Sequence, residues 1–345
     1  MMPKFKIIIS AFLLFTLLFN CKSIGPGAIE RDRGSYVEAL SLTNRQEMLA
    51  NIVRAKYNQP PVFLKIKTIT ASPSLELGVD VDNAVGGGVP VKTNINPRIV
   101  YKEDPNIFYE PLSGKEFASE MLMPVGLLPV FLMINNGFSF TAISDLLFVS
   151  INNLTNSRNA SIARREDYKK AIACFNTLFE QKLFMFQVRR SEIVDEDPTL
   201  NIYVNPESYK NEAYTNLKKI LKFEPKNNIL PIKLGLVNDD SSLIINTRSV
   251  LALINYLSNF VVVPEKHRDI VWPSKLEMNN SPITIYSSKS KPESSNLSIF
   301  LNDYWFYIKD TDINSQNTLY LLHIVFDMQA QISNSNNLQL TLPIR

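Results

Sequence analysis

Few side chains in this 345-residue chain have the types and spacing that catalysis or metal binding requires. Nucleophilic catalysis needs a base beside the nucleophile, and the only histidines are His267 and His323. The sequence has no G-x-S-x-G elbow, no H-E-x-x-H helix and no pair of cysteines at zinc-ligand spacing. We expect His323 to be a satisfied core histidine within a helix, and His267 to be solvated in a charged loop. The sequence therefore predicts no catalytic residue, no metal site and no cofactor.

Neighbouring carboxylates and one internal cysteine provide the remaining reactive groups. Asp239-Asp240 and the pair Asp310 and Asp312 could act in acid–base chemistry, but such residues in polar segments usually solvate turns. We expect them to be turn residues. Cys174 lies beside Phe175 in a predicted helix and is expected to be a small buried hydrophobic side chain.

Cys21 is the residue with the clearest predicted chemistry. Lys4 and Lys6 precede an apolar run that ends just before it. This order is typical of a secretory signal peptide, and the run is too short to span a membrane, which takes about 20 apolar residues. The segment Leu-Phe-Asn-Cys at 18–21 resembles the lipobox of bacterial lipoproteins, although Phe19 and Asn20 depart from the pattern. We expect residues 1–20 to be a signal peptide and Cys21 to carry acyl chains. A plain signal peptide and an uncleaved anchor are the alternatives.

The composition is that of a soluble globular protein. Hydrophobic residues make up 45% of the chain and charged residues 20%. The net charge of +3 includes the two lysines of the predicted signal peptide, which leaves about +1 for the rest. A strong non-specific binder of nucleic acid needs a concentrated basic face, so no nucleic-acid partner is expected. With Cys21 acylated, Cys174 would have no disulfide partner.

Residues 21–35 lack an apolar period and are predicted to be a lipidated tether, followed by one globular region over 36–345. Its first helix is expected to start at Thr43, with Gln46 completing a capping box, and to end at Pro60-Pro61. The predicted buried stripe of this helix is Met48, Leu49, Ile52, Val53 and Tyr57. Strands are predicted next at 62–70, at 75–81, through a glycine-rich hairpin tip at 86–88 into 89–93, and within an extended stretch over 99–112.

A helical block is predicted at about 113–182, with helices near 115–123, 125–134, 140–154 and 165–181. Strands are predicted after it at 183–189, 200–204, 243–247, 283–287, 297–301, 304–309 and 338–342, interrupted by helices at 249–259 and 315–330. Because strands and helices do not alternate one for one, the sequence predicts an α+β fold with a mixed or antiparallel sheet and a central helical block.

Two apolar segments are candidates for an interaction surface. In the run Tyr304, Trp305, Phe306 and Tyr307, strand alternation places Tyr304 and Phe306 on one face, and Trp305 and Tyr307 on the other. One pair could line a ligand pocket or an interface; burial of both faces is the interpretation we favour. The second segment, Met121 to Ile134, suits a helical-hairpin core, and any exposed part of it would mark a partner or membrane-facing surface.

Several segments, taken in order, resemble a family of uncharacterised bacterial outer-membrane lipoproteins. They lie at 29–72 (Ile-Glu-Arg-Asp-Arg and Pro-Pro-Val-Phe-Leu), 107–125 (Tyr-Glu-Pro-Leu-Ser-Gly-Lys-Glu-Phe), 150–154 (Ser-Ile-Asn-Asn-Leu), 247–257 (Thr-Arg-Ser-Val-Leu) and 304–310 (Tyr-Trp-Phe-Tyr-Ile-Lys-Asp), with a Leu-Thr-Leu-Pro terminus. The resemblance implies a location and an anchor, and no activity. Lys22 follows the cysteine where an aspartate would favour retention in the inner membrane, which implies delivery to the outer membrane.

These observations lead to one expected function and one alternative. We expect a non-enzymatic, lipid-anchored outer-membrane lipoprotein that faces the periplasm and acts as a structural or interaction subunit of a larger envelope assembly. By analogy, we name the outer-membrane core complex of a type IV secretion system first. Its partners would be the outer membrane, through acyl chains on Cys21, and other envelope proteins. The alternative is a periplasmic small-ligand-binding protein or enzyme with an aromatic-lined pocket at 304–307 and loop groups such as His267.

Overall fold

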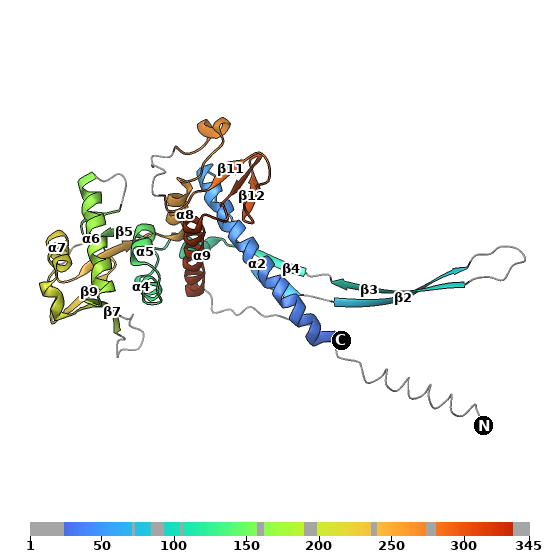
Figure 1. The fold of residues 1–345 in the computed structure, drawn as a ribbon, viewed down its shortest axis with the longest axis horizontal. Coiled ribbons are helices and arrows are strands. Elements are labelled where there is room, and N and C mark those ends of the chain that lie inside the picture. Colours follow the sequence, from blue (N-terminus) through green and yellow to red (C-terminus); the bar gives the residue numbers. More distant parts are fainter. Residues whose placement is uncertain are drawn as a thin grey trace, which may run out of the picture.

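The structure is a computed structural model that describes residues 24–70, 73–83, 93–103, 106–156, 162–189, 199–235, 240–273 and 281–333. Its mixture of helices and strands confirms the predicted α+β class. Three parts follow one another along the molecule (Figure 1): a six-stranded sheet with its helices at one end, a helical centre with a three-stranded sheet, and a two-stranded ribbon at the other end.

Helix α2 (Ile24–Lys56) is longer than predicted, because it begins well before Thr43, the predicted start. Residues 24–35, within the predicted tether, are helical, and Pro26 lies in the first turn, where its missing N–H costs nothing. Thr43 does not cap the helix; its hydroxyl donates to the carbonyl of Leu40 (3.0 Å) within the helix. Gln46 donates to the carbonyl of Ser298 (3.1 Å), so it contacts the later sheet.

The second half of α2 is the spine of the central part. The predicted stripe from Met48 to Tyr57 is confirmed, since its five side chains are at most 8% exposed. This stripe packs against α8 (Val250–Ser258) and α9 (Ile313–Ser333). The helix ends at Lys56, shortly before Pro60 as expected.

The chain then forms a ribbon of two successive antiparallel pairs. Strand β1 (Leu64–Thr70) pairs with β4 (Asn106–Pro111), and beyond them β2 (Pro73–Asn83) pairs with β3 (Thr93–Glu103). The first two strands and β4 lie where they were predicted. The predicted glycine tip at 86–88 and residues 89–92 of the predicted return strand lie outside the described residues, and the described part of that strand starts at Thr93. The β2–β3 pair extends away from the rest of the molecule (Figure 1).

The predicted helical block is confirmed, apart from the end of its third helix. It contains α3 (Gly114–Phe117), a π-helical turn η1 (Ala118–Leu122), α4 (Leu127–Asn135), α5 (Phe140–Leu147) and α6 (Ile162–Glu180). The helix predicted over 140–154 is wrong beyond Leu147. Strands β5 (Phe148–Ile151) and β6 (Leu154–Thr155) follow instead. Phe148, Val149 and Ile151 favour extended backbone, and Asn152 takes a positive φ of 48° in the turn.

Those two strands form one edge of a mixed six-stranded sheet in the order β6-β5-β10-β9-β8-β7. Its other strands are β7 (Phe184–Arg189), β8 (Thr199–Val204), β9 (Ile229–Lys233) and β10 (Leu243–Thr247). Only the β9–β10 pair is parallel. The sequence analysis missed β9, and also α7 (Glu212–Leu221), which packs with α6 beside this sheet.

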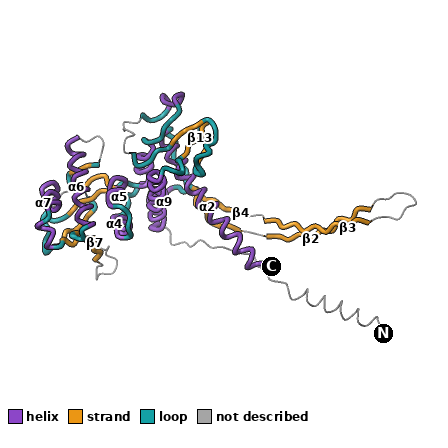
Figure 2. The backbone as a smooth tube through the Cα atoms, viewed as in Figure 1, coloured by secondary structure: helices purple, strands orange, loops and turns teal. Residues whose placement is uncertain are grey.

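The C-terminal third supplies the second sheet and the last helix. Strands β11 (Tyr286–Ser288), β12 (Ser298–Leu301) and β13 (Tyr304–Tyr307) form an antiparallel sheet with β13 in the centre. Short 3₁₀ helices η2 (Pro206–Lys210) and η3 (Glu265–Ile270) occupy loops. Figure 2 shows this sheet beside α2. The strand predicted at 338–342 lies outside the described residues. Among the helices that the structure describes, none has the length and apolarity to cross a membrane.

Candidate functional site

The predicted aromatic run lies on β13, where its two faces have different surroundings. Tyr304 is 9% exposed and Phe306 is fully buried. The ring of Phe306 meets Tyr57, the residue after the end of α2, edge-on at 6.0 Å between centroids. This face of the sheet is therefore part of the core, and it fixes β13 to the end of α2.

His267 of η3 belongs to the same cluster, so the prediction of a solvated histidine is wrong. The Tyr57 hydroxyl lies 2.7 Å from His267 Nδ1, and the imidazole meets the ring of Tyr304 edge-on at 5.0 Å. Burial, and secondarily Tyr304, raises the pKa of Tyr57 to about 12. The phenol is therefore protonated at neutral pH and can donate to His267. This arrangement holds η3 onto α2 and β13, which is a structural role.

Trp305 and Tyr307 lie on the opposite face and are only half-buried, so the favoured prediction of a strand buried on both faces is also wrong. The register places Phe300 opposite Trp305 and Tyr286 opposite Tyr307. The ring centroids of these pairs are 5.4 Å and 5.7 Å apart. Phe300 is 57% exposed. We call the four residues Phe300, Trp305, Tyr307 and Tyr286 the aromatic face.

Lysines border this aromatic face. Lys291 Nζ lies 5.6 Å from the ring centre of Trp305, and Lys309 Nζ lies 4.4 Å from that of Tyr286. Ammonium groups over aromatic rings gain a cation–π attraction of roughly 0.5–1 kcal/mol at exposed sites. A surface of half-buried rings with cations at its edge suits a protein partner that supplies apolar and acidic side chains.

A cleft of about 410 Å³ opens between this sheet and α2. It is lined by Leu42, Gln46, Lys291, Pro292, Glu293, Ser295, Asn296, Ser298 and Trp305. Trp305 is the only member of the predicted aromatic run that reaches it. Glu293 is the only carboxylate in the lining, Lys291 is its only lysine, and the lining includes no histidine.

The carboxylates considered for catalysis have structural partners. Asp310 accepts hydrogen bonds from the backbone and side-chain nitrogens of Asn296, and Asp312 accepts from the backbone nitrogen and hydroxyl of Ser315 at the start of α9. Their prediction as turn residues is confirmed. The backbone carbonyl of Asp240 accepts from Glu224 N (2.7 Å), and Asp239 lies outside the described residues.

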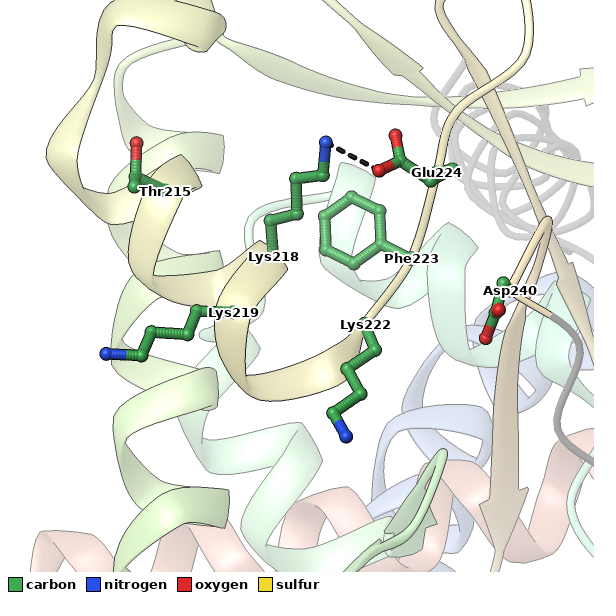
Figure 3. Close-up of a pocket in the computed structure, with 7 residues that line it drawn as sticks. All are labelled: Thr215, Lys218, Lys219, Lys222, Phe223, Glu224 and Asp240. Atoms are coloured by element: carbon green, nitrogen blue, oxygen red, sulfur yellow. Dashed lines mark ion pairs between the residues drawn. The ribbon is translucent and has the colours of Figure 1, made fainter.

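A second cleft, of about 430 Å³, lies beside α7. It is lined by Thr215, Lys218, Lys219, Lys222, Phe223, Glu224 and Asp240. Lys218 is paired with Glu224 at 2.7 Å. Figure 3 shows the three ammonium groups pointing in different directions rather than toward one point. This geometry does not make a converging site for an anion, although three lysines share the cleft.

The remaining sequence candidates have no catalytic arrangement. His323 is half-buried in α9 and its Nε2 lies 3.4 Å from Asp327, but its buried Nδ1 has no hydrogen-bond partner among the described residues, so it is not the satisfied core histidine predicted. Cys174 is half-buried against the core, and burial raises the pKa of its thiol. Within the described part of the chain, no three His, Cys, Asp or Glu side chains gather as a metal site.

The apolar segment Met121 to Ile134 is divided between core and surface. Six of its fourteen residues are buried, with Val130 fully and Phe131 almost fully enclosed. Leu122 and Met123 are 52% and 59% exposed in the turn after η1. The segment therefore forms part of a helical core and has an exposed apolar corner; that this corner is a partner or membrane-facing surface stays a prediction.

Sequence reasoning missed Tyr57, Phe300 and Tyr286 as neighbours of the aromatic run. Tyr286 and Phe300 lie on strands that were predicted within a few residues, and their register against β13 was the missing information. Cys21, the predicted acylation site, lies outside the described residues. In comparisons with known proteins, no protein-family model, no curated protein and no solved structure matches this chain.

Proposed function

We propose that this chain is a lipid-anchored outer-membrane lipoprotein that faces the periplasm and acts as a non-enzymatic structural or interaction subunit of an envelope assembly. The observation that carries the proposal is the aromatic face. Four aromatic side chains lie together there, bordered by lysines, in the middle of a well-packed sheet. Large aromatic residues near the centre of a surface patch are the usual anchors of protein interfaces.

The length of α2 supports the anchor. Acyl chains on Cys21 would sit three residues before Ile24, the first residue of the helix. A 33-residue helix is about 50 Å long, and its first half extends beyond the central part (Figure 1). Such a helix would act as a rigid spacer between the bilayer and the aromatic face. Two or more acyl chains are needed for stable attachment to a membrane.

The identity of the assembly rests on analogy. The core complex of a type IV secretion system is the first candidate, because lipoproteins of this size commonly decorate such complexes. The partner at the aromatic face would present apolar and acidic side chains, because the bordering charges include Lys291 and Lys309.

A small-ligand carrier is the second candidate, and the cleft beside Trp305 is the observation that favours it. The cleft combines one indole, a lysine and several hydroxyl and amide groups, a lining that suits a small polar ligand. Quenching of Trp305 fluorescence by a soluble cell-wall fragment, lost in Trp305→Phe, would favour this function over the first.

The proposed function is tested by gentle detergent extraction of the tagged full-length protein, followed by size analysis and identification of co-purifying proteins. We expect a particle much larger than the 39.2 kDa chain, containing other envelope proteins. Trp305→Ala with Phe300→Ala should remove those proteins, whereas the control Tyr209→Ala, exposed on the far part of the molecule, should not. A strictly monomeric particle without envelope proteins would contradict the proposal.

A further inference from the structure

The six-stranded sheet and its helices form a unit that is inserted into the rest of the fold. We call residues 127–247, from the start of α4 to the end of β10, the sheet unit. The central body is the part built from α2, η1, α8, α9 and the three-stranded sheet. The chain enters the sheet unit after η1 and leaves it before α8. Both connections are short, since they comprise only residues 123–126 and 248–249.

The two connections lie side by side. Pro124 and Ser249 form an antiparallel bridge, and the backbone nitrogen of Val125 donates to the carbonyl of Arg248 (3.1 Å). The hydroxyl of Thr247 donates to the carbonyl of Val125 (2.6 Å). The chain therefore enters and leaves the sheet unit at one place, which we call the junction.

Beyond the junction, the two parts share few contacts between helices or strands. Each closely packed pair of elements in the described part of the chain belongs to one part alone: α4 packs with α5 and β7, and α8 packs with α2, α9 and η1. The rings of Phe138 and Tyr320 stack across the boundary with centroids 6.3 Å apart, but Tyr320 is 57% exposed. Relative motion is the default for two such parts unless their interface is large and hydrophobic.

Arg248 lies at the junction and contacts both parts. Its Nη1 donates to the backbone carbonyls of Asp145, Leu146 and Phe148, at the end of α5 in the sheet unit. A cation at the C-terminus of a helix also interacts favourably with the helix dipole. On the other side, the guanidinium carbon lies 4.4 Å from the ring centre of Tyr256 in α8 of the central body. Arg248 therefore bridges the two parts through a cation–π contact.

We propose that the sheet unit turns as a rigid body on the central body about the junction, and that the contact between Arg248 and Tyr256 latches it in the orientation of this structure. Hinges consist of a few residues at the ends of elements, which absorb the change in backbone dihedral angles. Gly126, the residue before α4, suits this place, because glycine restricts the backbone least. Two short connections permit rotation of the sheet unit but not its separation.

The latch is expected to open readily. Its stabilisation across the boundary comes from a cation on an aromatic ring, whereas the hydrogen bonds of the Arg248 side chain stay with α5 when the sheet unit turns. This inference goes beyond the proposed function and uses neither the anchor nor the aromatic face. An assembly subunit with such a hinge can hold one partner on the central body while the sheet unit adjusts to another.

The test measures distances between the two parts in the full-length protein by pulsed electron paramagnetic resonance. The background carries Cys21→Ser and Cys174→Ala, so that no native thiol takes a label. Spin labels on Asn216→Cys in α7 and Asn317→Cys in α9, both exposed positions, report across the parts. A control pair, Asn216→Cys with Glu166→Cys in α6, lies within the sheet unit. We expect the distance distribution across the parts to be at least twice as wide as that of the control pair.

Tyr256→Leu removes the ring from the latch and keeps an apolar side chain at this half-buried position. The latched population, relative to other orientations, should fall about fivefold. This widens or shifts the distribution across the parts and leaves the control pair unchanged. Tyr203→Leu is the matched control variant, because Tyr203 is also half-buried but lies on β8 within the sheet unit. It should leave the distribution across the parts as in wild type.

Equal widths of the two distributions in wild type would overturn the hinge. An unchanged distribution across the parts in Tyr256→Leu would overturn the latch. Equal widening of the control pair in Tyr256→Leu would also overturn the latch, because Tyr256 would then be a residue that the whole fold depends on.

Discussion

Adjacent residues of β13 provide a sharp test of the aromatic face. Phe306 is fully buried and contacts Tyr57, whereas Trp305 is half-buried and contacts Phe300 and Lys291. Phe306→Ala and Trp305→Ala each remove one aromatic side chain from the same strand. The two substitutions therefore differ chiefly in which face of the sheet they affect.

The expected losses of stability follow from burial. A fully enclosed phenylalanine that is cut back to alanine costs about 3–5 kcal/mol, because a cavity adds to the lost transfer free energy. Trp305→Ala removes a ring that already contacts water on one side. Its loss should be about 1 kcal/mol, mainly from the contact with Phe300, since an aromatic pair contributes roughly 0.5–1.5 kcal/mol.

Urea unfolding monitored by circular dichroism measures both free energies of unfolding. We expect Phe306→Ala to lower the free energy of unfolding at least twice as much as Trp305→Ala. Trp305→Ala should keep the fold and lose envelope partners, whereas Phe306→Ala should lose both together. Equal destabilisation by the two variants would show that both faces of β13 are core, and the aromatic face would then not be an interface.

Two further predictions concern groups that hold the parts together. Arg248 is buried, and its Nη1 donates to the backbone carbonyls of Asp145, Leu146 and Phe148. Because these carbonyls lose their donor in Arg248→Met, that substitution should lower the free energy of unfolding by roughly 3 kcal/mol, measured in urea melts. The pKa of Tyr57 is raised from 10.0 to about 12 in the folded protein. The protonated phenol therefore contributes to the stability of the folded protein fully below pH 10, and this contribution is lost as pH rises through 12. Stability should therefore fall more steeply between pH 10 and 12 in wild type than in Tyr57→Phe, and parallel pH profiles would contradict this.

Periodicity predicted the elements whose stability depends on a buried face. The stripe of α2 from Met48 to Tyr57 and the helix α6 both follow from apolar residues at helical spacing. The first half of α2 has no such spacing, and its described side chains over 33–44 are mostly exposed. The sequence pattern therefore did not predict a helix in this half of α2.

Short strands were harder to predict because tertiary pairing decides them. Residues 148–151 continue an apolar run that suits a helix, but pairing with β10 makes them a strand. Strand β9 contains Pro231, which argues against a strand in an isolated sequence.

The candidate site could be predicted only in part. Alternation along 304–307 correctly separated Tyr304 and Phe306 from Trp305 and Tyr307. Which face is buried depends on Tyr57 and His267, which lie far away in sequence and reach β13 only in the folded chain.

Fatty-acid labelling of Cys21, combined with membrane fractionation, tests the central claim of a lipid-anchored subunit most directly. Wild type should incorporate labelled palmitate and stay in the outer-membrane fraction through a high-salt wash, because stable attachment takes two or more chains. Cys21→Ser should fold normally and lose the label, and it should appear in the periplasm or remain in the inner membrane with its signal uncleaved. Wild type without label, or Cys21→Ser retained in the outer membrane like wild type, would contradict the claim.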